Sequence, residues 1–161
     1  DMLCSAFFWR HPEVETVILR PTHIVGTVSN APSNYLRLPR IPVLLGFDPL
    51  IQVIHEEDVI DAIVATLLPG ARGVFNVSGP PAVPLSTLVD LLGKPVLRVP
   101  HFLFGPLMAR MWKGGFWSFP PDQIDHLRYG CMVDDGRIRR ELGFAPRRSL
   151  EETVAAFRAR Q

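Results

Sequence analysis

The stretch VILRPTHIVG, residues 17–26, decides the fold class of this chain. It opens within TVILR (16–20), an apolar run rich in β-branched residues that is typical of a strand covered on both faces. After Arg20 we expect the strand to pass directly into a turn that carries His23. A buried strand that ends in such a turn is typical of the floor of a cofactor or substrate site.

Helices and strands alternate around this stretch. Residues 3–9 predict the end of a helix, which Pro12 closes. IQVIH (51–55) and GVFNVSG (73–79) predict strands, and residues 56–68 between them predict a helix. The apolar residues of that helix share one face at helical spacing. They are Val59, Ile60, Ile63, Val64, Leu67 and Leu68. The alternation predicts an α/β chain.

The other segments carry turn and capping signals. Residues 28–49 are rich in proline, serine and asparagine, and we expect a long excursion there rather than a core element. Gly93 and Gly143 are placed to end two helices. Asp134 is placed to cap one helix, and Ser149 opens an S-x-x-E capping box for the last helix. The further elements expected are helices over 84–92, 121–130, 135–142 and 150–160 and a strand over 95–100.

The composition indicates an ordinary globular protein. The chain has 161 residues, 47% of them hydrophobic, and a net charge of +1, which gives no bulk electrostatic argument for a nucleic acid or an anionic membrane as partner. Cys4 and Cys131 lie far apart, so we expect reduced thiols in the cytoplasm. No secretory signal or spanning stretch is recognised, and a chain that starts at Asp1 rather than at methionine suggests a fragment.

Several classes of site lack their signature in this sequence. The five histidines form no HxH or HxxxH pair, so no metal site is expected. They are His11, His23, His55, His101 and His126. There is no G-x-S-x-G elbow of a serine hydrolase. The basic cluster RIRR (137–140) is explained by the surface of a capped helix, and we expect no nucleic acid as partner.

Four motifs occur in a fixed order along the chain. They are VILRPTHIVG (17–26), IQVIHEEDVIDAIVATL (51–67), GVFNVSG (73–79) and VDDGRIRRELGFAPRRSLEETVAAF (133–157). This series resembles the C-terminal half of the extended short-chain dehydrogenases/reductases, the NAD-dependent epimerase/dehydratase family. The resemblance implies the last part of a Rossmann-like, doubly wound parallel sheet with a small, mostly helical substrate-binding lobe.

The resemblance also implies a division of the chain. Residues 1–28 and 48–79 would supply the last strands and helices of the Rossmann-like domain. Residues 29–47 and 80–161 would form the substrate-binding lobe. The N-terminal dinucleotide-binding half, with its GxxGxxG turn, is absent from this sequence.

The family's catalytic Tyr-x-x-x-Lys pair is missing too, since neither Tyr35 nor Tyr129 has a lysine four residues on. The resemblance therefore implies NAD or NADP as cofactor of the complete protein, and a chain that is inactive alone. No catalytic residue is expected within it. Whether the parent is an oxidoreductase or an isomerase stays open.

Site residues carried over from the resemblance cluster after the first strand. Pro21 and Ile24 would contact the cofactor, and Thr22 and His23 would face a small-molecule substrate. The competing interpretation makes His23 an ordinary turn histidine that bonds its own loop.

Three further polar residues are read as structural. Asp58 is expected to be the N-cap of the long helix, and His55 to order the turn before it. Asn76 is expected to bond nearby backbone rather than a ligand.

Two departures from the family bear on the substrate. Nucleotide-sugar epimerases carry an arginine for the diphosphate before the strand at 51–55, where this chain has Leu50, Ile51 and Gln52. Arg128 lies near the position of a second arginine, but outside a matching motif. The apolar, aromatic stretch 101–119 suggests a greasy pocket or lid. The substrate is therefore expected to be apolar or derived from a sugar.

Two rival functions stay open. One is a non-catalytic binding module derived from this fold, and the other is a peripheral membrane protein that uses residues 101–119 as an interfacial helix. Without the other half of the sheet, the strands would expose unpaired backbone and apolar surface. We therefore expect the isolated chain to dimerise, to swap elements or to remain with the missing half.

Overall fold

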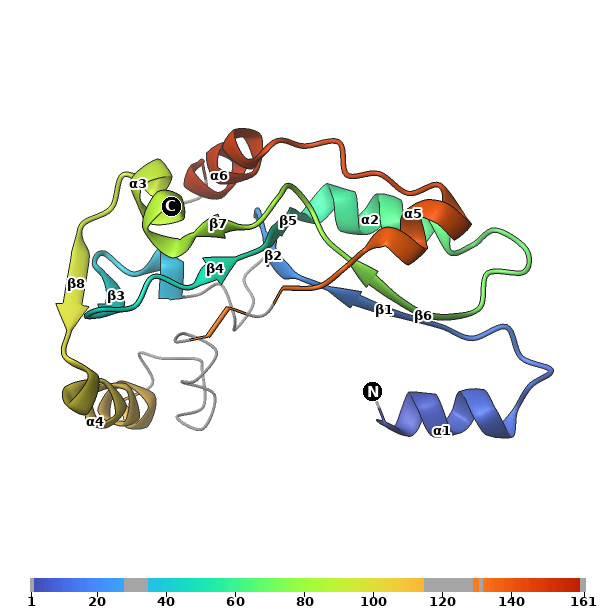
Figure 1. The fold of residues 1–161 in the computed structure, drawn as a ribbon, viewed down its shortest axis with the longest axis horizontal. Helices are drawn as coiled ribbons and strands as arrows, with labels where there is room; N and C mark the ends of the chain where they lie inside the picture. The colour runs from blue at the N-terminus through green and yellow to red at the C-terminus, as the bar shows by residue number, and fades with distance from the viewer. Residues whose placement is uncertain (1, 28–34, 115–128, 131, 160–161) are drawn as a thin grey trace.

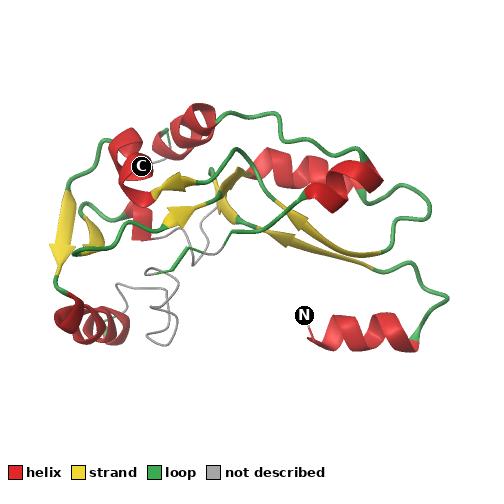
Figure 2. Cartoon of the chain, in the orientation of Figure 1, coloured by secondary structure: helices red, strands yellow, loops and turns green. Residues whose placement is uncertain are grey.

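The computed structural model describes residues 2–27, 35–114, 129–130 and 132–159, which form an α/β fold (Figures 1 and 2). The helices are α1 (Met2–Arg10), α2 (Glu56–Ala65), α3 (Leu85–Leu92), α4 (His101–Lys113), α5 (Gly136–Leu142) and α6 (Leu150–Arg158). The strands are β1 (Val17–Pro21), β2 (His23–Val25), β3 (Ile41–Leu44), β4 (Leu50–Ile51), β5 (Val53–His55), β6 (Gly73–Val77), β7 (Val83–Pro84) and β8 (Val96–Val99).

Strands β1 and β6 form a parallel pair between two helical layers. Val17 lies opposite Gly73, and the register runs to Pro21 opposite Val77. Side chains alternate between the faces of a strand. Accordingly, Leu19 packs in one cluster with residues of α2 and α5, whereas Ile18 lines a cavity beside α1. Figure 1 shows α1 on one side of this pair and α2 and α5 on the other.

The prediction of a turn after Arg20 is wrong, because a second strand, β2, begins at His23. Its three residues pair in parallel with β5, with His23 opposite Val53. At Thr22 the chain leaves β6, after the Thr22 N–H donates to the Val77 carbonyl at 2.9 Å. A strand of three residues forms here because β5 lies beside it, a tertiary effect that local sequence does not show.

The segment 28–49 is not the peripheral excursion that its prolines suggested. In its described part, Ile41–Leu44 forms β3, which pairs in parallel with β8. The larger core cluster contains four of its side chains, which are Tyr35, Leu36, Ile41 and Leu44. The Lys94 ammonium donates to the carbonyls of Leu36 and Leu38, at 2.9 and 3.1 Å, which fixes the turn before β3. The expectation of no core element is therefore wrong.

Helix α2 buries a narrow face. Asp58 and Ala62 are its buried residues, and Val59 packs against the smaller core cluster. The other five apolar residues of the expected face are 49 to 76% exposed. They are Ile60, Ile63, Val64, Leu67 and Leu68. Ile60, Ile63 and Val64 of α2 are thus exposed, whereas Leu67 and Leu68 follow the helix, which ends at Ala65 rather than at residue 68.

The two glycine helix ends and the capping box are confirmed. Gly93 and Gly143 end α3 and α5 in the left-handed conformation, with φ of 66° and 64°. Ser149 and Glu152 form both hydrogen bonds of the capping box of α6. The cap predicted at Asp134 is wrong, because the N-cap of α5 is Asp135, one residue later, and the Asp135 side chain makes no capping bond; the Asp134 carboxylate accepts from the Gly136 N–H at 2.7 Å. The helix expected over 121–130 lies outside the described residues.

Helix α4 covers the described part of the aromatic stretch 101–119. Phe104 and Met108 are buried in the larger core cluster, so its inner face is core rather than pocket lining. Phe102, Leu103 and Trp112 are exposed. Among the described residues, no helix has the length and apolar character needed to cross a membrane.

Candidate functional site

The carboxyl ends of β1 and β6 lie side by side and point toward β2 and β5 (Figure 1). Pro21 and Val77 are partners there, and Thr22 and Ser78 follow them in the chain. In open α/β sheets, ligands bind outside the carboxyl ends of the strands. Of the four residues expected to contact cofactor or substrate, Pro21 ends β1, Thr22 follows it, and His23 and Ile24 lie in β2.

These four residues differ in exposure. Pro21 is exposed at the end of β1, and Thr22 and His23 are half-buried. The Thr22 hydroxyl oxygen is buried and has no hydrogen-bond partner among the described residues. The His23 N–H donates to the Gln52 carbonyl at 3.3 Å. Ile24 packs against the smaller core cluster, so its side chain is partly structural.

An acidic group lies beside the end of β6. The Ser78 hydroxyl donates to the Asp135 carboxylate at 2.7 Å, and the Arg139 guanidinium binds both carboxylate oxygens at 2.8 and 2.9 Å. Burial alone would raise the pKa of Asp135, but the hydrogen bonds from Arg139 and Ser78 and the charge of Arg139 hold it below its ordinary value. Asp135 is thus a carboxylate at neutral pH.

The segment before α5 is held against the strands by two side-chain amides and a glycine. The Gln52 side chain accepts from the Val133 N–H at 2.8 Å and donates to its carbonyl at 3.3 Å. Asn76 donates to the Asp134 carbonyl at 3.1 Å, as expected of a residue that bonds nearby backbone. A side chain at Gly130 would overlap the Leu50 carbonyl oxygen, so the two backbones touch there.

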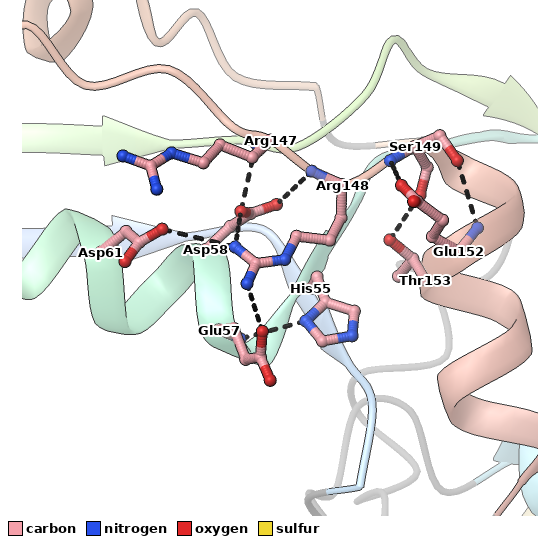
Figure 3. A network of polar contacts seen from close by, with 9 residues as sticks. All are labelled: His55, Glu57, Asp58, Asp61, Arg147, Arg148, Ser149, Glu152 and Thr153. Carbon is pink, nitrogen blue, oxygen red and sulfur yellow. Dashed lines mark hydrogen bonds and ion pairs between the residues drawn. The ribbon is translucent and has the colours of Figure 1, made fainter.

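A second polar cluster, drawn in Figure 3, joins α2 to the loop before α6. Asp58 has no exposed side-chain surface and accepts from the Arg147 and Arg148 N–H groups at 3.1 and 3.2 Å. The Arg148 guanidinium adds a bond to Asp58 at 2.9 Å and contacts Asp61 and Glu57. The cluster therefore fixes the entry to α6.

The N-cap expected at Asp58 is wrong. The cap residue is His55, whose Nδ1 accepts from the Glu57 N–H at 3.1 Å. The expectation that His55 orders the turn is confirmed. Asp58 lies in the first turn of the helix, where its carboxylate points at the loop before α6 rather than at its own backbone (Figure 3).

The sequence of this chain was compared with family models and with curated proteins. No family model matches the chain. Uncharacterised proteins of Mycobacterium tuberculosis and Mycobacterium bovis are 30% identical over 149 residues, which are 92% of this chain and 39% of theirs. The chain thus spans about two fifths of these curated relatives.

Solved structures match the chain almost completely. A dTDP-glucose 4,6-dehydratase from Bacillus anthracis in complex with NAD has a TM-score of 0.69 and 15% identity, over 99% of this chain and 48% of that one. A UDP-glucuronic acid 4-epimerase from Bacillus cereus in complex with NAD has a TM-score of 0.68 and 16% identity, over 99% and 46%. The chain has the fold of the NAD-dependent epimerase/dehydratase family. The expected resemblance and the Rossmann-like α/β class are confirmed.

Within this epimerase/dehydratase fold, the sequence pattern missed Ser78, Asp135 and the Asp58–Arg148 pair. One signal for Asp58 was available, because Asp58 and Ala62 are four residues apart and share the inner face of α2. A carboxylate on a buried face needs a partner that donates hydrogen bonds. The partner itself, in the loop before α6, could not be read from spacing.

Two cavities of the epimerase/dehydratase fold lie away from Pro21–Ile24. One of about 380 Å³ lies between β3, β8 and α3, and its lining includes Phe47, Val89 and Arg98. The other, of about 400 Å³, lies between α1 and the β1–β6 pair. Among the described residues, no three histidine, cysteine or acidic side chains are grouped to hold a metal ion.

Proposed function

We propose that this chain is the substrate-side, C-terminal portion of an NAD(P)-dependent epimerase, dehydratase or reductase. The observation that carries the proposal is the parallel β1–β6 pair, whose carboxyl ends lead into the segment Pro21–Ile24. Enzymes that bind NAD or NADPH share this fold over about half of their own chains. The division into residues 1–28 and 48–79, and 29–47 and 80–161, is part of the same proposal.

On this proposal the site residues take the roles that the family resemblance implies. Pro21 and Ile24 contact the cofactor through packing and backbone, and Thr22 and His23 face the substrate. The buried Thr22 hydroxyl without a partner supports a polar ligand group nearby, because a buried polar group left unpaired costs about 1–3 kcal/mol.

The substrate is a small molecule that is apolar or derived from a sugar and lacks a diphosphate. Ile51 is 9% exposed, and the Gln52 amide is already bonded to the Val133 backbone. Neither side chain can therefore hold a diphosphate as an arginine would. Arg128 lies outside the described residues.

The chain alone is inactive on this proposal, because its sequence has neither GxxGxxG nor Tyr-x-x-x-Lys. Calorimetric titration with NAD and with NADP tests it on the full translated product of the gene and on the 161 residues. We expect the product to bind one of them with a Kd of about 10 μM or below, and the 161 residues to bind neither at about 1 mM. A full product that binds neither would leave the non-catalytic binding module as the better reading.

A further inference from the structure

A cavity of about 400 Å³ lies between α1 and the amino ends of β1 and β6. Ile18, Gly73 and Val74 line it, and each is the first or second residue of its strand. The contacts proposed for cofactor and substrate, Pro21–Ile24, begin at the opposite end of β1. The cavity is therefore separate from that site, and its volume lies in the range of about 300–1,000 Å³ that is usual for small-molecule sites.

The lining of this cavity is apolar and positively charged. Its apolar side chains are Phe8, Trp9, Ile18 and Val74. Arg72 and Arg137 also line it, whereas no described aspartate or glutamate does. An anion is not stabilised by apolar surface alone and needs cationic donors, which a guanidinium supplies in pairs. The lining therefore suits a ligand that has an apolar body and an anionic group.

Arg72 lacks an anionic partner in the described part of the chain. It forms no ion pair there, and its Nε is buried without a hydrogen-bond partner. Its guanidinium lies over the Phe8 ring, with Cζ 4.7 Å from the ring centroid. A guanidinium that contacts a ring through its face keeps its in-plane N–H groups for a carboxylate. Because an unpaired buried donor is costly, an acceptor from a ligand is favoured here.

Arg137 of α5 reaches the same cavity with its orientation fixed. Its two Nη atoms donate to the carbonyls of Val74 and Arg72, at 3.0 and 3.3 Å, and its Nε donates to Glu141 at 2.9 Å. A Cβ at Gly73 would lie 3.1 Å from both Nη atoms, so glycine leaves room for the guanidinium. Each Nη uses one of its two hydrogens in these bonds, and the second can meet a ligand. A donor held in this way loses little freedom on binding, which favours affinity.

We propose that this cavity binds a small carboxylic acid with a flat, apolar body. The carboxylate accepts from the Arg72 guanidinium and from the remaining Nη hydrogens of Arg137. The body lies against Phe8 and Trp9, whose ring centroids are 5.3 Å apart at an interplanar angle of 89°, so that a flat ligand can stack on one ring and meet the other. Ser5 also lines the cavity and adds a hydroxyl donor. The site goes beyond the proposed function, because its ligand is neither the nicotinamide cofactor nor the substrate.

Calorimetric titration of the full translated product with cinnamate tests the site. We expect a Kd of about 100 μM or below for cinnamate, and no binding of its neutral analogue cinnamyl alcohol at about 1 mM. Arg72→Gln should weaken cinnamate binding about tenfold or more, because it removes the charge that pairs with the carboxylate. The matched control Arg98→Gln, in β8 and in the lining of the other cavity, should change the Kd by less than about twofold. Saturation with NAD or NADP should leave the Kd for cinnamate unchanged.

The proposal is wrong if cinnamate does not bind, if cinnamyl alcohol binds as tightly, if Arg72→Gln leaves the Kd unchanged, or if NAD or NADP displaces cinnamate. If Arg72→Gln yields no folded product, Trp9→Ala takes its place, because Trp9 is 79% exposed and its loss spares the core. Trp9→Ala should weaken binding about threefold or more, and an unchanged Kd again overturns the site. A product that binds cinnamate but no nicotinamide cofactor overturns the proposed function and leaves this site standing.

Discussion

Asp58 is a carboxylate without exposed surface, and its donors come from two residues about ninety positions away along the chain. Such a group stays buried because two backbone N–H groups and the Arg148 guanidinium compensate the lost hydration. The pair therefore specifies where the loop before α6 must lie. It adds little net stability compared with apolar packing, but its rupture leaves an uncompensated charge.

Asp58→Asn should lower the free energy of unfolding by about 3 kcal/mol. The NH₂ group of the new amide would face N–H donors whose hydrogen bonds the carboxylate now accepts. Urea denaturation at neutral pH measures this. The control Glu57→Gln removes a charge that also contacts Arg148 but is 57% exposed, and should cost less than about 1 kcal/mol. Equal effects of the two changes would show that burial of Asp58 is not what matters.

Asp135 makes the free energy of unfolding depend on pH. Since hydrogen bonds from Arg139 and Ser78 lower its pKa in the folded state, the carboxylate binds protons less readily there than in the unfolded chain. Its contribution to stability is therefore full at neutral pH and is lost as the pH falls below about 4. Asp135→Asn should cost about 1 kcal/mol at pH 7, and this difference should shrink in urea titrations toward acid pH. The exposed Asp90 offers the control Asp90→Asn, and a pH-independent deficit for Asp135→Asn would contradict the assignment.

For single residues, the sequence predicted the role of a side chain when its partner lies close by in the chain. The role of His55 at the turn is confirmed because its partner, the Glu57 N–H, is two residues on. The role of Asp58 could not be predicted because its partners depend on the path of a distant loop. The predicted cofactor and substrate contacts of Pro21–Ile24 stay predictions, which the titrations above address.

Among the elements, those with complete local signals were predicted and those that depend on a partner were not. β1 has a continuous apolar run, and α6 has a capping box followed by the buried residues Thr153, Val154 and Phe157. β2 has three residues, and β3 follows a stretch rich in proline. Both form because β5 and β8 lie beside them, so tertiary pairing decided where local preference was weak.

The end of β6 approaches β5 so closely that only glycine fits. A Cβ at Gly79 would overlap the Val53 carbonyl oxygen and would lie 2.9 Å from the Ile54 Cα. Gly79→Ala should therefore lower the free energy of unfolding by about 2–4 kcal/mol, because the backbone of either Gly79 or β5 would have to move to make room for the methyl group. The matched control is Gly105→Ala in α4, where a Cβ meets nothing within 4 Å and helix propensity favours alanine by up to about 1 kcal/mol. Thermal unfolding of both variants checks the contrast, and a Gly79→Ala protein as stable as its parent would refute the close contact.

Across the part of the chain that the structure describes, four two-stranded sheets are joined by two apolar clusters. The larger cluster draws on β3, β8, α3, α4 and α6, and the smaller one lies between the β1–β6 pair and helices α2 and α5. The order of motifs predicted the Rossmann-like α/β class with parallel strands, because each motif is a strand or helix with its own turn. It could not predict the division into separate two-stranded sheets, because strand pairing depends on contacts between distant segments.

The absence of a suitable cation at the start of β5 leads to a prediction for the whole site. Ile51 pairs with Val83 in the β4–β7 sheet, and Gln52 bonds both backbone groups of Val133. A nucleoside diphosphate that entered here would lose the hydration of its phosphates without gaining a charged partner. In the full translated product, UDP and dTDP at about 1 mM should therefore raise the Tm by less than about 1 °C, whereas the preferred nicotinamide cofactor should raise it by several degrees. Differential scanning fluorimetry compares them directly.

If UDP stabilises the product as strongly as the cofactor does, the diphosphate is bound elsewhere, and Arg128→Ala should then abolish the shift. A shift that survives Arg128→Ala would instead place the diphosphate in the half of the fold that this chain does not match.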